Sequence, residues 1–82
     1  MGRIENAMNK IQTLNNEIEW LNNEILEAER RYNIITDQYM EGIILGPVGK
    51  EQNKLQRYAD KCRAKIQKNM QEIHRLRTRY NI

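Results

Sequence analysis

The 82-residue chain contains no Phe and no Ser, and it has one Cys, one Pro and one His. Since Cys62 has no second cysteine to pair with, a disulfide within the chain is excluded, and a single cysteine is typical of a reducing compartment. An apolar run of about 18 residues is also lacking, so we expect no membrane-spanning helix. The first residues carry charges where a signal peptide has an apolar segment. We therefore expect a cytoplasmic protein, in a cell or in an infected host.

The scarcity of reactive side chains argues against catalysis. Cys62 and His74 are twelve residues apart, about 18 Å along one helix, so they cannot form a nucleophile–base pair within the chain. One Cys and one His are too few for a zinc site, which usually has at least three protein ligands. The glycines lack the lysine–serine end of a phosphate-binding loop. We expect no enzyme, no catalytic residue, no metal and no cofactor.

What the chain does contain is an apolar pattern with a period of seven residues. Apolar residues recur at alternate steps of three and four over five heptads, and the segment 14–18 repeats as 21–25. This is the a/d pattern of a coiled-coil helix. Its members are Ile4, Ala7, Ile11, Leu14, Ile18, Leu21, Ile25, Ala28, Tyr32, Ile35 and Tyr39.

A second, weaker heptad pattern follows a break. Gly42 suits the C′ position of a helix and Pro47 forbids helical continuation, although the apolar content of this connection is unusual for an exposed loop. Residues 1–82 are therefore expected to form one all-α domain, with a helix at 3–41, an apolar loop at 42–49 and a helix at 50–80. The second seam consists of Leu55, Ala59, Cys62, Ile66, Asn69, Ile73, Leu76 and Tyr80.

A short connection makes the two helices antiparallel neighbours, so the sequence predicts a coiled-coil hairpin. With Pro47 as the pivot, Tyr32 pairs with Cys62, Ile18 pairs with Leu76, and the segment 4–11 overhangs without a partner. This register also brings like charges together, Glu24 with Glu72 and Arg31 with Lys65. We expect a homodimer that forms a four-helix bundle, because two helices alone bury one stripe each. A parallel pairing through the first helix is the rival arrangement.

Apolar residues outside the two seams are candidates for a protein interface. Trp20 and Ile34 lie on one line of the first helix, and tryptophan is enriched at interfaces. The loop side chains either fold back beside Tyr39 and Leu55 or form a docking surface. The candidates are Ile4, Met8, Ile11, Trp20, Ile34, Ile43, Ile44, Leu45 and Val48. We expect a small adaptor, scaffold or inhibitor that binds a protein partner.

Charge is distributed unevenly and supports an alternative function. Residues 1–41 hold four basic and eight acidic groups, and residues 42–82 hold ten basic and three acidic groups. The basic residues of the second half follow three- and four-residue steps, forming what we name the basic stripe, which could neutralise phosphates of a nucleic acid or complement the acidic first helix. The basic stripe consists of Lys54, Arg57, Lys61, Lys65, Lys68, Arg75 and Arg79.

Asn69 on the second seam has two interpretations, either as a polar residue that specifies register or partner, or as a tolerated residue near a wet edge. The overhang at 4–11 supports a further alternative, a structural subunit that polymerises through a contact that does not close.

Overall fold

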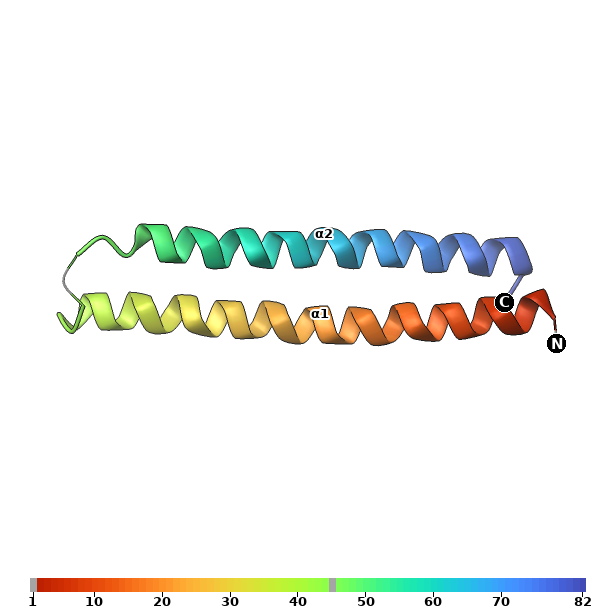
Figure 1. The fold of residues 1–82 in the computed structure, drawn as a ribbon, viewed down its shortest axis with the longest axis horizontal. Helices are drawn as coiled ribbons and strands as arrows, with labels where there is room; N and C mark the ends of the chain where they lie inside the picture. The colour runs from red at the N-terminus through yellow and green to blue at the C-terminus, as the bar shows by residue number, and fades with distance from the viewer. Residues whose placement is uncertain (1, 45) are drawn as a thin grey trace.

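The computed structural model describes residues 2–44 and 46–82, which form two long antiparallel helices, α1 (Arg3–Met40) and α2 (Gly49–Tyr80). The helices lie side by side in both ribbon views, and the two termini are at the same end (Figure 1). The molecule measures 61 × 14 × 13 Å. The predicted all-α hairpin is confirmed, and the observed helix bounds differ by one residue at two ends from those expected. The four-helix bundle stays a prediction.

The first helix ends in a Schellman motif at Gly42. The N–H of Ile43 donates to the carbonyl of Gln38 at 2.9 Å, and the N–H of Gly42 donates to the carbonyl of Tyr39 at 3.1 Å. Gly42 has a φ of 77°, which glycine adopts without the steric cost of a Cβ atom. The expected C′ glycine is therefore confirmed. Pro47 lies two residues before α2, so it marks the start of the second helix and not the tip of the loop.

The core consists of two apolar clusters separated by a polar layer. Buried Asn69 of α2 lies between the clusters along the helix, and its amide reaches Glu17 of α1. The cluster towards the loop contains Leu21, Ile25, Ala28, Ala59 and Cys62, with Leu55 and Ile66 packed against it. The cluster towards the termini contains Ala7, Ile11 and Leu76, with Leu14, Ile73 and Tyr80 packed against it.

The predicted register of the hairpin is wrong by one heptad. Leu76, expected opposite Ile18, packs with Ala7 and Ile11, and Cys62, expected opposite Tyr32, packs with Ile25. The segment 4–11 therefore does not overhang, because α2 reaches back along it. The error arose from placing the turn at Pro47, near the start of α2, and not midway between the two helices.

Polar contacts on the flanks of the seam explain why the observed register is the better one. Lys65 pairs with Glu17 at 3.7 Å and Lys10 pairs with Glu72 at 3.4 Å. Neither of the two like-charge contacts of the predicted register is present, since Glu24 instead accepts a hydrogen bond from the Tyr58 hydroxyl at 2.7 Å. A seven-residue shift leaves the apolar seam in phase, so these polar partners and the cover of segment 4–11 by α2 distinguish the two registers.

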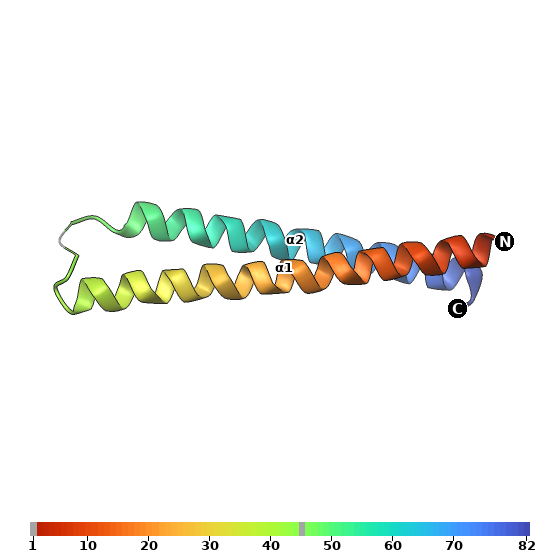
Figure 2. The ribbon, with the colours of Figure 1, turned by 60° about the horizontal axis from the view of Figure 1, so that its bottom comes forward.

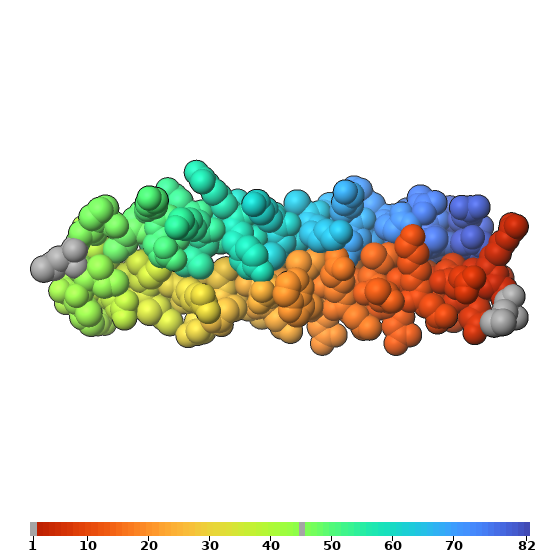
Figure 3. Space-filling view, in the orientation of Figure 1, coloured from red at the N-terminus to blue at the C-terminus, as the bar shows by residue number. Residues whose placement is uncertain are grey.

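The hairpin has no third layer. Figure 2 shows the two helices crossing, with α1 passing in front of α2 towards the termini. Figure 3 shows one face of this single pair of helices, whose side chains meet along one seam. Among the described residues, no side chain is less than 2% exposed. The fold thus leaves most of its length in contact with solvent on both broad faces.

Candidate interaction surfaces

The two broad faces of the hairpin are distinguished by the polar contacts that flank the seam. On one face Glu17 meets Lys65 and Glu24 meets Tyr58, and on the other Arg63 Nη2 donates to Glu29 Oε1 at 2.8 Å. Trp20 lies three residues after Glu17 and four before Glu24, so it belongs to the first face.

We name this first face the Trp20 face. On α1 it carries Trp20 and Ile34, and the side chain of Glu27 lies between them on the same seven-residue line. On α2 it carries Lys54, Lys61 and Lys68, which we name the lysine line. Glu27 and Lys54 line one shared cleft, together with Tyr58, which places the two lines on the same side of the molecule.

The predicted apolar interface residues on α1 differ in their exposure to solvent. Trp20 is 56% exposed and Ile34 is 40% exposed, so both are available on the surface of the single chain. Ile4 and Met8 are also exposed. Ile11 is buried against Leu76 within the chain, and it therefore leaves the set of candidates for contact with another molecule.

The described side chains of the loop do not all fold back over the end of the hairpin. Ile43 is 66% exposed and Tyr39 is 51% exposed, whereas Ile44 and Val48 are half-buried. Folding back beside Tyr39 is therefore wrong for Ile43. Leu45 lies outside the described residues. Because Ile43 is exposed, the interpretation of this end of the molecule as a docking surface stays a prediction.

The basic stripe is partly neutralised within the chain. Lys65 pairs with Glu17, and Arg75 pairs with Glu72, while the Arg79 guanidinium lies 5.4 Å from the centre of the Tyr80 ring. Within the described part of the chain, no carboxylate lies within 4.0 Å of the remaining four members. Those members are Lys54, Arg57, Lys61 and Lys68.

Two glutamates have pKa values well below the ordinary range for a carboxyl group. Hydrogen bonds from Arg30 and then Arg31 lower the pKa of Glu27 to about 2. A hydrogen bond from Arg75 is the main cause that lowers the pKa of Glu72 to about 2. Both carboxylates therefore stay charged in mildly acidic solution, and Glu27 is a fixed negative charge on the Trp20 face.

Tyr58 has a pKa shifted in the opposite direction. Its hydroxyl donates a hydrogen bond to Glu24, which raises the pKa of Tyr58 to about 12, with partial burial as the next cause. The tyrosine is a neutral hydrogen-bond donor at any physiological pH. A hydroxyl group with so high a pKa is not suited to accept and release protons near neutral pH.

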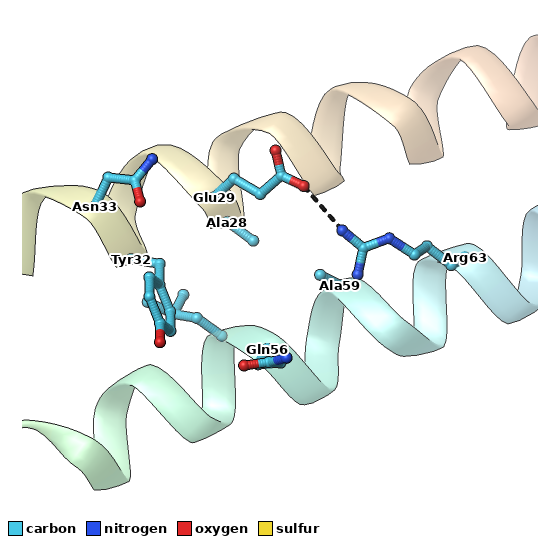
Figure 4. Close-up of a pocket in the computed structure, with 8 residues that line it drawn as sticks. Ala28, Glu29, Tyr32, Asn33, Gln56, Ala59 and Arg63 are labelled. Atoms are coloured by element: carbon cyan, nitrogen blue, oxygen red, sulfur yellow. Dashed lines mark hydrogen bonds and ion pairs between the residues drawn. The ribbon is translucent and has the colours of Figure 1, made fainter. Parts of the chain in front are cut away.

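A cleft of about 360 Å³ opens on the face opposite Trp20, where Ala28 of α1 meets Ala59 of α2. Two alanines at the same level leave room between the helices, and the ion pair of Glu29 and Arg63 crosses the edge of the cleft (Figure 4). The side chain of Tyr32 borders the opposite end. The cleft has no cluster of titratable groups suited to acid–base chemistry.

Asn69 is buried, with 3% of its surface exposed. Its Nδ2 donates to Glu17 Oε1 at 3.0 Å, and Glu17 also faces Lys65. A polar side chain that is both buried and satisfied fits the interpretation that Asn69 specifies register better than the interpretation of a tolerated residue at a wet edge. The sequence marked the position but did not identify its partner.

The reactive side chains lie apart from one another. Cys62 is buried in the cluster towards the loop and His74 is exposed on α2. Among the described residues, no group of three His, Cys, Asp or Glu side chains is placed to hold a metal ion. Neither α1 nor α2 is long and apolar enough to cross a membrane. Comparisons with protein-family models, curated proteins and solved structures found no match to this chain.

Proposed function

We propose that the protein is a non-enzymatic coiled-coil hairpin that self-associates, in the first instance as a dimer, and binds a protein partner as a small adaptor, scaffold or inhibitor. One observation carries this proposal. Among the described residues no side chain is less than 2% exposed, while large apolar side chains on both faces and at both ends are 38% to 78% exposed.

The energetic reason is that one seam is a small core for a chain of this size. An 82-residue chain buries only about 60% of the surface that its unfolded state exposes, so its stability as a monomer is marginal. Packing two hairpins together removes further apolar surface from water, at about 25 cal/mol per Å². Self-association therefore stabilises the fold as well as creating a larger scaffold.

The partner-binding part of the proposal rests on the loop end. Ile43 is an exposed, branched apolar side chain next to half-buried Ile44, at the end of the molecule opposite both termini. An apolar tip on a long, rigid arm suits contact with a groove on another protein. Such a contact needs no catalytic group.

The experiment for self-association is the mass of the protein in solution, measured by sedimentation equilibrium over a wide concentration range. We expect a transition from monomer to dimer that reaches a plateau. A monomer at every concentration would overturn self-association. A mass that keeps growing would indicate the polymerising alternative, although the 4–11 overhang on which that alternative was based is absent. For the partner, Ile43→Asp should abolish capture of a bound protein while helicity and mass are unchanged.

A second candidate function is binding to nucleic acid, and it is favoured by the unpaired members of the basic stripe. Lys54, Lys61 and Lys68 recur every seven residues, about 10 Å apart along α2, with no carboxylate of the described chain within 4.0 Å. Fluorescence anisotropy of labelled DNA and RNA at two salt concentrations tests it. Salt-sensitive binding that Lys61→Glu together with Lys68→Glu removes would support it, and no binding at low salt would eliminate it.

A further inference from the structure

We propose that the Trp20 face is the surface on which a second copy of this chain docks, with α1 of each copy lying along α2 of the other and both loops at the same end. This inference rests on the proposed self-association and adds to it the surface, the orientation and the side chains in contact. Its starting point is the difference in charge between the two helices.

Charge decides which helices can lie against each other. Helix α1 holds four basic and seven acidic side chains, whereas α2 holds ten basic and three acidic ones. Two hairpins packed face to face have two symmetric arrangements. A two-fold axis perpendicular to the helices and parallel to the face places α2 against α2 of the other copy and brings like charges together. A two-fold axis parallel to the helices places α1 of each copy against α2 of the other copy. Helices of opposite net charge then meet in both contacts.

The second arrangement also determines which residues meet, because rotation about the long axis leaves every residue at its original height. Within one chain Glu24 contacts Tyr58 on one face and Glu29 contacts Arg63 on the other. The middle of 24–29 is therefore level with the middle of 58–63. It follows that Glu27 of one copy lies level with Lys61 of the other.

The same relation extends along both lines by one heptad in each direction. Trp20 lies level with Lys68 of the second copy, and Ile34 lies level with Lys54. A lysine chain can cover an apolar surface with its methylene groups while its ammonium group stays in water, and an ammonium group over an indole ring is attracted to it. The contacts thus comprise Lys61 against the Glu27 carboxylate, which it shares with Arg30 and Arg31, between two stretches of apolar cover. Each contact occurs twice in the dimer because of the symmetry.

The charged groups in the middle of the Trp20 face already have partners within the chain, and these include Arg31, which pairs with Glu27 together with Arg30. Glu17 already pairs with Lys65, Lys10 with Glu72, and Glu24 accepts the Tyr58 hydroxyl. A second copy therefore leaves none of these groups unpaired when it covers them, which is the condition under which burial of charge is tolerated.

The size of the face is adequate for a stable dimer. The extents of 61 and 14 Å outline a face of about 850 Å² in projection, which is similar in size to the roughly 800 Å² of accessible surface that each partner buries in a standard interface. The opposite face matches less well under the same symmetry, because exposed Leu26 would lie level with Asp60 of the second copy. An apolar side chain against a carboxylate gains nothing from the contact.

A charge-swap experiment tests the pairing of Glu27 with Lys61. Glu27→Lys places two cations across the interface, and Lys61→Glu places two carboxylates there. Each variant alone should form a dimer more weakly than the unsubstituted chain, by about tenfold or more. In an equimolar mixture each of the two contacts in the heterodimer joins a cation to a carboxylate. Heterodimers should therefore form with affinity near that of the unsubstituted chain.

Glu19→Lys and Arg77→Glu are controls on the opposite face that make the same two changes of charge. Both residues are exposed and outside the ion pairs of the chain, so these two variants should dimerise alone and show no preference for each other. Equal preference in the control and test mixtures would overturn the proposed face. Circular dichroism of each variant checks that the loss of the Glu27 contacts with Arg30 and Arg31 has not unfolded α1.

The single tryptophan supplies a direct readout. Emission from Trp20 should shift to shorter wavelength in step with dimer formation, because the indole passes from water into the interface. A dimer with unchanged emission would overturn the Trp20 face while leaving self-association intact. A protein that stays monomeric would instead overturn the proposed function, so the two failures are distinguishable.

Orientation has its own measurement. With Cys62→Ala removing the native thiol, a spin label attached through Lys50→Cys marks the loop end of each copy. Loops at the same end predict a distance between labels well below the 61 Å length of the hairpin. A distance near that full length would indicate the arrangement with loops at opposite ends and would overturn the axis proposed here.

Discussion

The amide of Asn69 donates a 3.0 Å hydrogen bond to the carboxylate of Glu17, and this contact joins the two helices in the polar layer between two apolar clusters. The residues are 52 positions apart in the chain. The contact is specific to the observed register, because a shift by one heptad places Asn69 opposite Ile25. An unpaired amide in that apolar surrounding would be unfavourable.

Removing the acceptor and removing the donor should have opposite effects on stability. Glu17→Ala leaves buried Asn69 without its partner and should lower the free energy of unfolding by about 1 kcal/mol, whereas Asn69→Leu replaces the polar group by apolar volume and should raise it by a similar amount. Urea unfolding at one fixed protein concentration measures both, since any association makes stability concentration-dependent. Destabilisation by both variants would show that the amide contributes net stability.

The native thiol reports the register of the hairpin. Cys62 and Ile25 belong to the same cluster, so Ile25→Cys should give a disulfide within one chain on oxidation, seen by its faster mobility on a non-reducing gel. Tyr32→Cys, the partner of Cys62 in the register shifted by one heptad, should react much more slowly. Adding Asn69→Leu to Tyr32→Cys should speed its oxidation if the polar layer excludes the shifted register. An unchanged rate would assign the register to the flanking ion pairs.

The turn after α1 depends on Gly42. Its φ of 77° lies in the left-handed region, which costs a residue with a Cβ atom about 1 kcal/mol. Gly42→Ala should therefore lower the thermal unfolding midpoint measured by circular dichroism. Gly49→Ala is the matched control, because Gly49 is the first residue of α2 and a Cβ there meets nothing within 4 Å. A loss at Gly49 equal to that at Gly42 would argue against the Schellman motif as the cause.

Tyr58 should be the last tyrosine to ionise, because its pKa is raised to about 12 by its hydrogen bond to Glu24. Since its pKa is higher in the folded state than the ordinary 10, the contact stabilises the fold fully below pH 10 and is lost as the pH rises towards 12. Absorbance at about 295 nm follows tyrosinate formation. Tyr58→Phe should remove the latest phase of the titration, and Glu24→Gln should move that phase to lower pH.

Much of the fold follows from local patterns. The steps of three and four from Ile4 to Tyr39 are satisfied only by a helix with one apolar stripe, and Gly42 and Pro47 exclude its continuation. The exposed line of Trp20 and Ile34 could be found in the same way, because helical periodicity alone places a side chain on or off a seam. These are properties of residues close together in the chain.

The alignment of α1 with α2 depends on contacts between residues far apart in the chain. A heptad pattern repeats itself after seven residues, so both registers keep the apolar seam in phase. Placing the turn at Pro47 selected the register that left 4–11 without a partner. The contact between Glu17 and Asn69 and the separation of Glu24 from Glu72 distinguish the two registers. Local patterns are therefore sufficient to specify two amphipathic helices and the turn between them. Their register depends on the packing of one helix against the other, because a shift by one repeat keeps the seam in phase and exchanges the partners of residues far apart in the chain, such as Glu17 and Asn69.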